Sequence, residues 1–141
     1  MVSRWIDLPQ GLLAFGRVEP YLIQERRVIE VRDYAVAEGA TWVTVDITDT
    51  AATAAVIDAV KAVLPFPDWC ASSWDSIDDA FDEIRQGWRF PCVLEVRGLR
   101  STLANRPHLG LEAVVRLSEL RRAFSVAGDQ LTVLYVDESW G

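Results

Sequence analysis

Three short apolar segments predict buried β-strands. Residues 92–96 (CVLEV) and 131–136 (LTVLYV) are almost continuously apolar, which is typical of parallel strands covered by helices on both faces. Residues 41–47 (TWVTVDI) alternate instead, with an apolar side chain at every second position. This alternation predicts a strand with one face toward the core. Its inward side chains are expected to be Val43, Val45 and Ile47.

Two longer segments carry apolar residues at the spacing of a helix. Residues 51–64 follow the first predicted strand, and Asp49 or Thr50 is expected to cap the start of this helix. Residues 111–128 end at Gly128, a common helix stop, and residues 97–110 before them are expected to form a loop. The expected apolar stripes are Val56, Ile57, Val60, Val63 and Leu64 in the first helix, and Leu111, Val114, Val115, Leu117, Leu120 and Phe124 in the second.

The order of these elements predicts an α/β fold. Strands separated by helices pair in parallel through right-handed crossovers, so residues 41–136 are expected to form a three-stranded parallel sheet flanked by helices. We divide the chain into an N-terminal extension, residues 1–40, and an α/β domain, residues 41–141. Within the extension, residues 21–25 (YLIQE) and 26–33 (RRVIEVRD) are expected to form extra short strands.

An unusually acidic segment lies between the first two predicted strands. Residues 68–84 (DWCASSWDSIDDAFDEI) hold six acidic side chains, yet apolar residues recur among them at helical spacing. The pattern predicts one amphipathic helix that begins after a serine cap, Ser72 or Ser73. Its apolar face is expected to carry Trp74, Ile77, Phe81 and Ile84, and its acidic face Asp75, Asp78, Asp79 and Asp82.

The acidic face has two interpretations. It can be an ordinary solvated surface, because carboxylates in the first turn interact favourably with the helix dipole. The dipole does not reach Asp82 and Glu83, however, and carboxylates four residues apart repel each other at a cost of about 0.2–0.5 kcal/mol per pair. Such a face becomes favourable only against a positive counterpart, so we interpret it as a binding site.

Two kinds of counterpart could supply the positive charge. A divalent metal such as Mg²⁺ usually draws its ligands from several elements, and no second carboxylate cluster stands at another predicted strand end. A basic protein surface fits better, because Trp69 and Trp88 flank the segment and aromatic anchors beside charge are common at protein interfaces.

Composition narrows the possible functions. The formal net charge of −7 opposes binding to nucleic-acid phosphates and favours a basic partner. Two isolated cysteines, Cys70 and Cys92, and a single histidine, His108, form no metal or redox motif, so we expect no metal, no cofactor and no enzymatic activity. No apolar run approaches the roughly 18 residues of a membrane helix. The first residues do not resemble a signal peptide, which predicts a cytoplasmic protein.

The acidic segment resembles the barstar family, the intracellular inhibitors of secreted guanyl-specific ribonucleases. The likeness lies in LPFPDWCASSWDSIDDAFDEI (residues 64–84) and in GWRFPCVLEVRG (residues 87–98). The order of predicted strands and helices between residues 41 and 136 is similar to the family's as well. The matching positions are Pro67, Trp69, Cys70, Ala71, Ser73, the run from Trp74 to Asp79, Pro91, and Val93 to Glu95.

The resemblance implies a function and residue roles. The chain is expected to inhibit a guanyl-specific ribonuclease, of the barnase-like or actinomycete type, in a one-to-one complex without a small-molecule substrate. The carboxylate matching Asp79 takes the place of a substrate phosphate, the one matching Asp75 contacts the guanine-reading region, and the aromatic matching Trp69 packs over the active-site rim. The expected ribonuclease-binding residues are Trp69, Cys70, Ala71, Ser73, Trp74, Asp75, Asp78, Asp79, Asp82 and Trp88.

The sequence departs from the family pattern at several positions. The family's Gly and Asn positions hold Ala71 and Ser73, and Asp78 stands where the family's type member has an aromatic residue. Further acidic contacts of the family's last helix correspond to positions near Ala123 and Ala127. An alternative hypothesis is therefore a barstar-like acidic adaptor or immunity protein that binds another basic toxin or partner.

Overall fold

The protein is built on a parallel β-sheet. The computed structural model describes residues 5–9, 11, 13–14 and 19–140, and within them four strands form one sheet. The strands are β1 (Tyr21–Gln24), β2 (Thr41–Asp46), β3 (Cys92–Arg97) and β4 (Leu131–Asp137). They lie in the order β1-β4-β3-β2 and every neighbouring pair is parallel. The α/β class and the three expected strands are confirmed, but the expected total of three is wrong because β1 adds a fourth.

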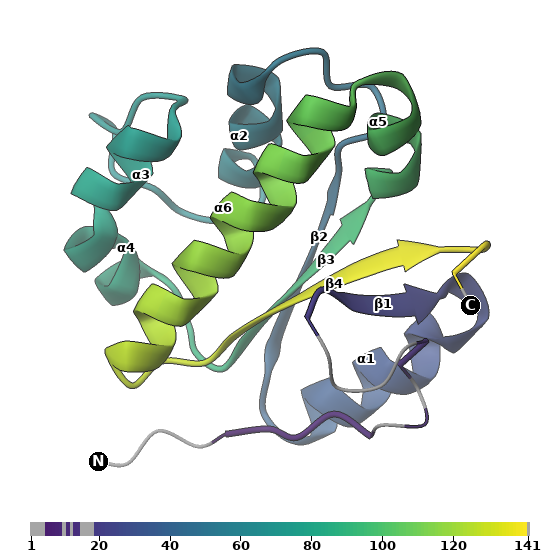
Figure 1. The fold of residues 1–141 in the computed structure, drawn as a ribbon. Helices are drawn as coiled ribbons and strands as arrows, with labels where there is room; N and C mark the ends of the chain where they lie inside the picture. The colour runs from purple at the N-terminus through teal and green to yellow at the C-terminus, as the bar shows by residue number, and fades with distance from the viewer. Residues whose placement is uncertain (1–4, 10, 12, 15–18, 141) are drawn as a thin grey trace.

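Residues 26–33 form a helix rather than the expected strand. A 3-10 turn (Glu25–Arg27) follows β1 and leads into α1 (Val28–Ala37). This helix carries the chain from β1 at one edge of the sheet to β2 at the other, across the face opposite to the remaining helices (Figure 1). Its buried residues, Val28, Val31 and Ala35, recur at helical spacing and pack on the sheet.

The other face of the sheet carries five helices within the described residues (Figure 1). They are α2 (Thr53–Lys61), α3 (Trp74–Asp79), α4 (Phe81–Gly87), α5 (Leu99–Asn105) and α6 (Pro107–Val126). The expected helix over residues 51–64 is confirmed as α2, although its N-cap is Ala52 without a side-chain bond, so the expected cap is wrong. The expected loop over residues 97–110 is also wrong, because α5 and the first turn of α6 occupy it.

The buried side of α6 differs in part from the predicted stripe. Leu117, Leu120 and Phe124 are buried as expected. Leu111 and Val115, by contrast, are exposed, because the small residues Gly110 and Ala113 let α6 approach its neighbours on the opposite side. The apolar pattern therefore predicts the helix but not the full set of residues that face the sheet.

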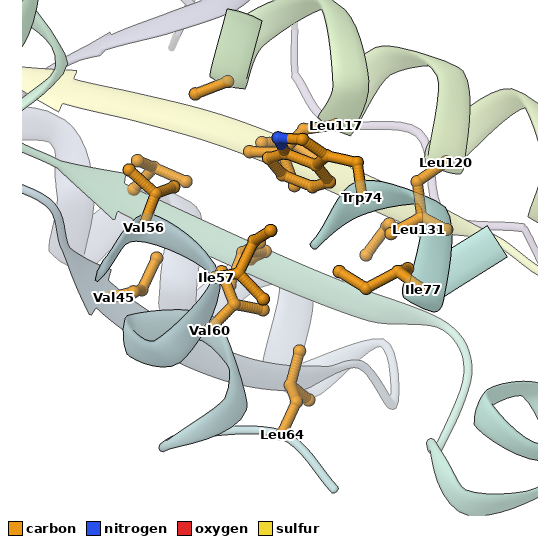
Figure 2. Packing of buried hydrophobic residues seen from close by; sticks show 14 of the residues in the cluster. Val45, Val56, Ile57, Val60, Leu64, Trp74, Ile77, Leu117, Leu120 and Leu131 are labelled. Atoms are coloured by element: carbon orange, nitrogen blue, oxygen red, sulfur yellow. The ribbon is translucent and has the colours of Figure 1, made fainter. Parts of the chain in front are cut away.

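One large core holds α2, α3 and α6 against the sheet. Figure 2 shows side chains from β2, α2, α3 and α6 converging between these elements, with the Trp74 indole near Leu117. The labelled residues of this core are Val45, Val56, Ile57, Val60, Leu64, Trp74, Ile77, Leu117, Leu120 and Leu131. The acidic segment is therefore fixed to the body of the protein by its own apolar face.

Gly98 allows β3 to turn into α5, and an alanine there is expected to destabilise the fold. Its φ is +93°, a conformation that L side chains rarely adopt. An added Cβ would lie 2.3 Å from Thr48 Oγ1 and 2.5 Å from the Thr48 nitrogen. We expect Gly98→Ala to lower the free energy of unfolding by about 2–3 kcal/mol through backbone strain and crowding, as measured by urea denaturation.

Gly128→Ala is the matched control for this substitution. Gly128 has nearly the same φ, +92°, but nothing lies within 4 Å of an added Cβ. Gly128→Ala should therefore lower the free energy of unfolding by about 1 kcal/mol, through backbone strain alone. Equal losses in the two variants would show that the close approach of Thr48 does not contribute.

Candidate protein-binding site

The helices α3 and α4 lie at one end of the molecule, beside α6 (Figure 1). They carry a set of exposed carboxylates. We call Asp75, Asp78, Asp79, Asp82 and Glu83, all of them exposed, the acidic surface. The opposite sides of the same helices carry buried or half-buried apolar residues, namely Trp74, Ile77, Phe81 and Ile84. The predicted separation of the segment into an apolar and an acidic face is confirmed.

The segment forms two short helices rather than the single helix predicted. Ala80, with φ −89° and ψ 5°, is the C-cap of α3 and the N-cap of α4. Asp82 and Glu83 consequently lie in the first turn of α4, where carboxylates interact favourably with the helix dipole. The repulsion inferred from the sequence is therefore smaller than expected, and within one helix only the pair Asp75 and Asp79 remains four residues apart.

Local hydrogen bonds hold the start of α3 and the loop before it. Ser73 is the N-cap, as one of the two serines predicted for this role, and its Oγ accepts a hydrogen bond from the Ser76 backbone nitrogen at 3.1 Å. Lys61 Nζ of α2 donates to the carbonyl oxygen of Cys70 at 2.6 Å. These bonds fix the orientation in which α3 presents its carboxylates.

Trp69 is the exposed aromatic residue of this loop. Its side chain is 55% exposed, and its Nε1 donates to the two carboxylate oxygens of Glu83 at 3.2 and 3.3 Å. The contact ties the indole to the acidic surface and leaves much of the ring open to solvent. Ala71 is exposed in the same loop, and Ser73 is half-buried.

Three of the expected binding residues have buried side chains in the free protein. Cys70, Trp74 and Trp88 all belong to the large core. Trp88 Nε1 donates to the carbonyl oxygen of Pro65 at 2.6 Å, so this residue anchors the loop. Burial also raises the pKa of the Cys70 thiol, and Lys61 opposes this rise. We conclude that these three side chains support the surface instead of forming it.

Residues of α6 border the acidic surface, although sequence reasoning placed none of them in the site. Glu112 Oε1 accepts hydrogen bonds from Trp74 Nε1 at 3.3 Å and from Thr53 Oγ1 at 2.6 Å, which joins α6 to α3 and α2. Arg116 and Glu119 follow one and two turns later on the same side of α6. The sequence shows that these three residues share one side of a helix. Only the packing of α6 beside α3 shows that this side faces the acidic surface.

Asp78 lies at the boundary between α3 and α6. Desolvation raises the pKa of its carboxyl group above the ordinary value, while the Arg116 guanidinium opposes the rise. Other carboxylates of the two helices add to it, namely Asp75, Glu119 and Asp79. Asp78 is thus in electrostatic contact with charges from both helices, which the sequence alone did not indicate.

His108 and Cys92 lie outside the acidic surface. Within the described residues, no group of three or more His, Cys, Asp or Glu side chains comes together as a metal site. His108 is exposed on the first turn of α6, and Cys92 is buried, which raises its thiol pKa to about 12. None of the helices in the described part of the chain is both long and apolar enough to cross a membrane.

The fold and the acidic surface define a small α/β protein with a protein-binding role. The sequence profile described as Barstar (barnase inhibitor) matches residues 40–136, a stretch that includes β2, β3, all but the last residue of β4, and the five helices α2 to α6. The chain therefore belongs to the Barstar family, a family of ribonuclease inhibitors and not of enzymes. No curated protein matches the chain. Family membership confirms the predicted resemblance and supports a barnase-inhibitor-like role.

Proposed function

We propose that this chain inhibits a guanyl-specific ribonuclease by covering its active site with the acidic surface and the loop before α3. In this complex of one inhibitor with one enzyme, Asp79 occupies the position of a substrate phosphate and Asp75 faces the guanine-reading region. Trp69 packs against the rim of the active site. The inhibitor acts in the cytoplasm and protects the cell from the ribonuclease before secretion.

This proposal depends on one observation: in a chain of the Barstar family, the carboxylates on α3 are exposed and form no ion pair with the neighbouring Arg85 and Arg116. Asp75 and Asp79 are exposed and one turn apart on a helix whose other face is buried. Arg85 of α4 pairs with Asp129, and Arg116 of the neighbouring α6 pairs with Glu119, so neither of these arginines forms an ion pair with Asp75 or Asp79. The two carboxylates are therefore available to a positive partner.

The chemistry of a ribonuclease active site suits such a surface. The enzyme must bind phosphate, so its active site is basic, and a carboxylate can replace the phosphate through charge-assisted hydrogen bonds. The remaining carboxylates, Asp82 and Glu83 among them, raise the association rate by long-range attraction. Because α3 is capped by Ser73 and its loop is bonded to α2, little ordering is needed on binding.

A second candidate function is the binding of another basic toxin. Asp78 favours it, because this exposed carboxylate stands where the family's type member has an aromatic residue. A partner with an additional basic side chain opposite Asp78 would fit this chain better than a guanyl-specific ribonuclease without that side chain. Both functions use the same surface and differ in the identity of the partner.

An inhibition assay tests the proposed function. Purified protein should be titrated into guanyl-specific ribonucleases of the barnase-like and actinomycete types, with cleavage of an oligonucleotide containing a single guanosine as the readout. We expect complete inhibition of at least one enzyme at one equivalent, and competition by guanosine 3′-monophosphate, because both ligands need the phosphate site.

A pancreatic-type ribonuclease, which cleaves after pyrimidines, serves as the control and should remain active. Because guanosine 3′-monophosphate itself blocks cleavage, the competition is measured as binding. Capture of the enzyme on the immobilised chain that saturating guanosine 3′-monophosphate does not reduce would contradict binding at the active site. If no guanyl-specific enzyme is inhibited, the second candidate function is favoured, and capture of secreted basic proteins on the immobilised chain would identify the partner.

A further inference from the structure

Arg116 of α6 is held less firmly than Arg85 of α4, the other arginine compared for this surface. Arg85 of α4 donates from Nε to Asp129 at 2.8 Å and from Nη2 to the carbonyl oxygen of Ala127 at 3.1 Å, so two bonds direct its charge toward the turn before β4. Arg116 forms one ion pair, to Glu119, with a nitrogen–oxygen distance of 3.5 Å. The guanidinium of Arg116 is therefore held less firmly than that of Arg85.

The position of Arg116 along α6 turns it toward α3. Glu112, one turn earlier on the same side, is hydrogen-bonded to Trp74 of α3, which fixes this side of α6 against the acidic segment. Arg116 is close enough to Asp78 to stabilise its ionised form. The guanidinium thus pairs with Glu119 of α6 and also attracts the carboxylate of Asp78 on α3.

The ion pair between Arg116 and Glu119 contributes little to folding. The two side chains are 38% and 53% exposed and three residues apart on one helix, a geometry in which solvent screens most of the attraction. Neither group is needed to satisfy a buried partner, so a stabilising role does not explain why a cation stands beside this surface. The role of Arg116 therefore concerns the binding of a partner to the acidic surface.

We infer that Arg116 is a specificity-determining residue that competes with the partner for the carboxylates of Asp78 and Glu119. This inference rests on the proposed function, because it concerns the same surface. A partner cation that binds these carboxylates competes with the positive charge of Arg116, so a partner with strong, well-placed basic groups binds better than a weakly basic one. Discrimination then comes from a repulsive element as well as from attraction.

The test compares Arg116→Gln with Arg122→Gln in the ribonuclease inhibition assay. Arg122 is exposed on α6 and lines the hollow between that helix and Pro20, away from α3. Both substitutions remove one positive charge, so they change long-range attraction to a similar degree. We expect Arg116→Gln to lower the inhibition constant about fivefold more than Arg122→Gln does, mainly through slower dissociation.

A measurement without any partner checks the local contact. The pKa of Asp78, followed by its carboxyl carbon signal in NMR, should rise in Arg116→Gln and stay unchanged in Arg122→Gln. An unchanged Asp78 pKa in Arg116→Gln, or equal inhibition constants for the two variants, would overturn this inference and leave the proposed function standing. A wild-type protein that inhibits no guanyl-specific ribonuclease would overturn the proposed function, and the inference with it.

Discussion

Replacing Glu95 with alanine is expected to lower the free energy of unfolding by about 3–5 kcal/mol at neutral pH. Glu95 is fully buried in β3. Its Oε1 accepts hydrogen bonds from Trp42 Nε1 at 2.8 Å and from Arg32 Nη2 at 3.1 Å, and its Oε2 accepts one from Arg97 Nε. Removal of the carboxylate leaves a cavity at a fully buried position and takes the acceptor from Trp42 and from the half-buried Arg32 and Arg97. Urea denaturation measures the loss.

The pH dependence of stability gives a second signature of Glu95. Burial alone would raise its pKa, but hydrogen bonds from Trp42, Arg97 and Arg32 outweigh burial and hold the pKa below the ordinary value of 4.5. The unfolded chain therefore binds more protons at acidic pH, and this contribution to stability, complete above about pH 5, declines as the pH falls toward the lowered pKa. The difference between wild type and Glu95→Ala should narrow as the pH falls below about 5, because the unfolded chain begins to bind the proton near the ordinary pKa of 4.5.

Glu25→Ala is the matched control for burial. Glu25 also pairs with Arg97, but its side chain is 43% exposed. An exposed pair contributes at most about 1 kcal/mol, so this variant should remain nearly as stable as wild type. Similar losses in Glu25→Ala and Glu95→Ala would show that the buried carboxylate is not the main contributor.

This cluster illustrates what the sequence could not reveal. The segment 92–96 was correctly predicted as a buried strand because its apolar residues dominate the pattern. Arg97 is a near neighbour of Glu95 in β3, but Arg32 comes from α1 and Trp42 from β2, which are far away in the chain. Local periodicity contains no information about such pairings, so the acidic residue within an apolar strand had no visible explanation.

The N-terminal region shows the limit of short patterns. In RRVIEVRD, the positions of Val28 and Val31 fit a helix, while its β-branched residues favour a strand. Position in the fold decides between them, because a parallel connection between the two edges of the sheet requires a crossover, and α1 provides it. The strand over residues 21–24 was predictable, but its pairing with β4, at the other end of the chain, was not.

The sequence predicted which residues of the candidate site carry its charges, but it did not predict the break into two helices or the position of α6 beside them. The apolar spacing correctly indicated that Trp74, Ile77 and Ile84 are buried, and α3 begins after Ser73, one of the two serines expected as its cap. The break at Ala80 was not visible, because alanine is the best helix former and gives no stop signal. The contribution of α6 depends on helix packing, which a single segment cannot show.

Reversing the charge of Asp79 is expected to weaken inhibition at least about a thousandfold. In the proposed complex, Asp79 enters a basic phosphate site, and truncation of one member of a desolvated charge pair costs about 2–5 kcal/mol. Asp79→Arg adds the repulsion between an arginine and the enzyme's own cations, which brings the total to roughly 4 kcal/mol or more. The inhibition constant, determined with the single-guanosine substrate, measures this effect.

The structure offers a control that carries the same change of charge. Asp33 is exposed on α1, across the sheet from the acidic surface. Asp33→Arg alters the net charge equally, so it should slow association by a small factor and leave dissociation unchanged, because long-range attraction acts mainly on encounter. Both variants should unfold within about 0.5 kcal/mol of wild type, since both positions are exposed. If the two reversals weaken inhibition to the same extent, the effect of Asp79 is one of net charge, and the residue does not occupy the phosphate site.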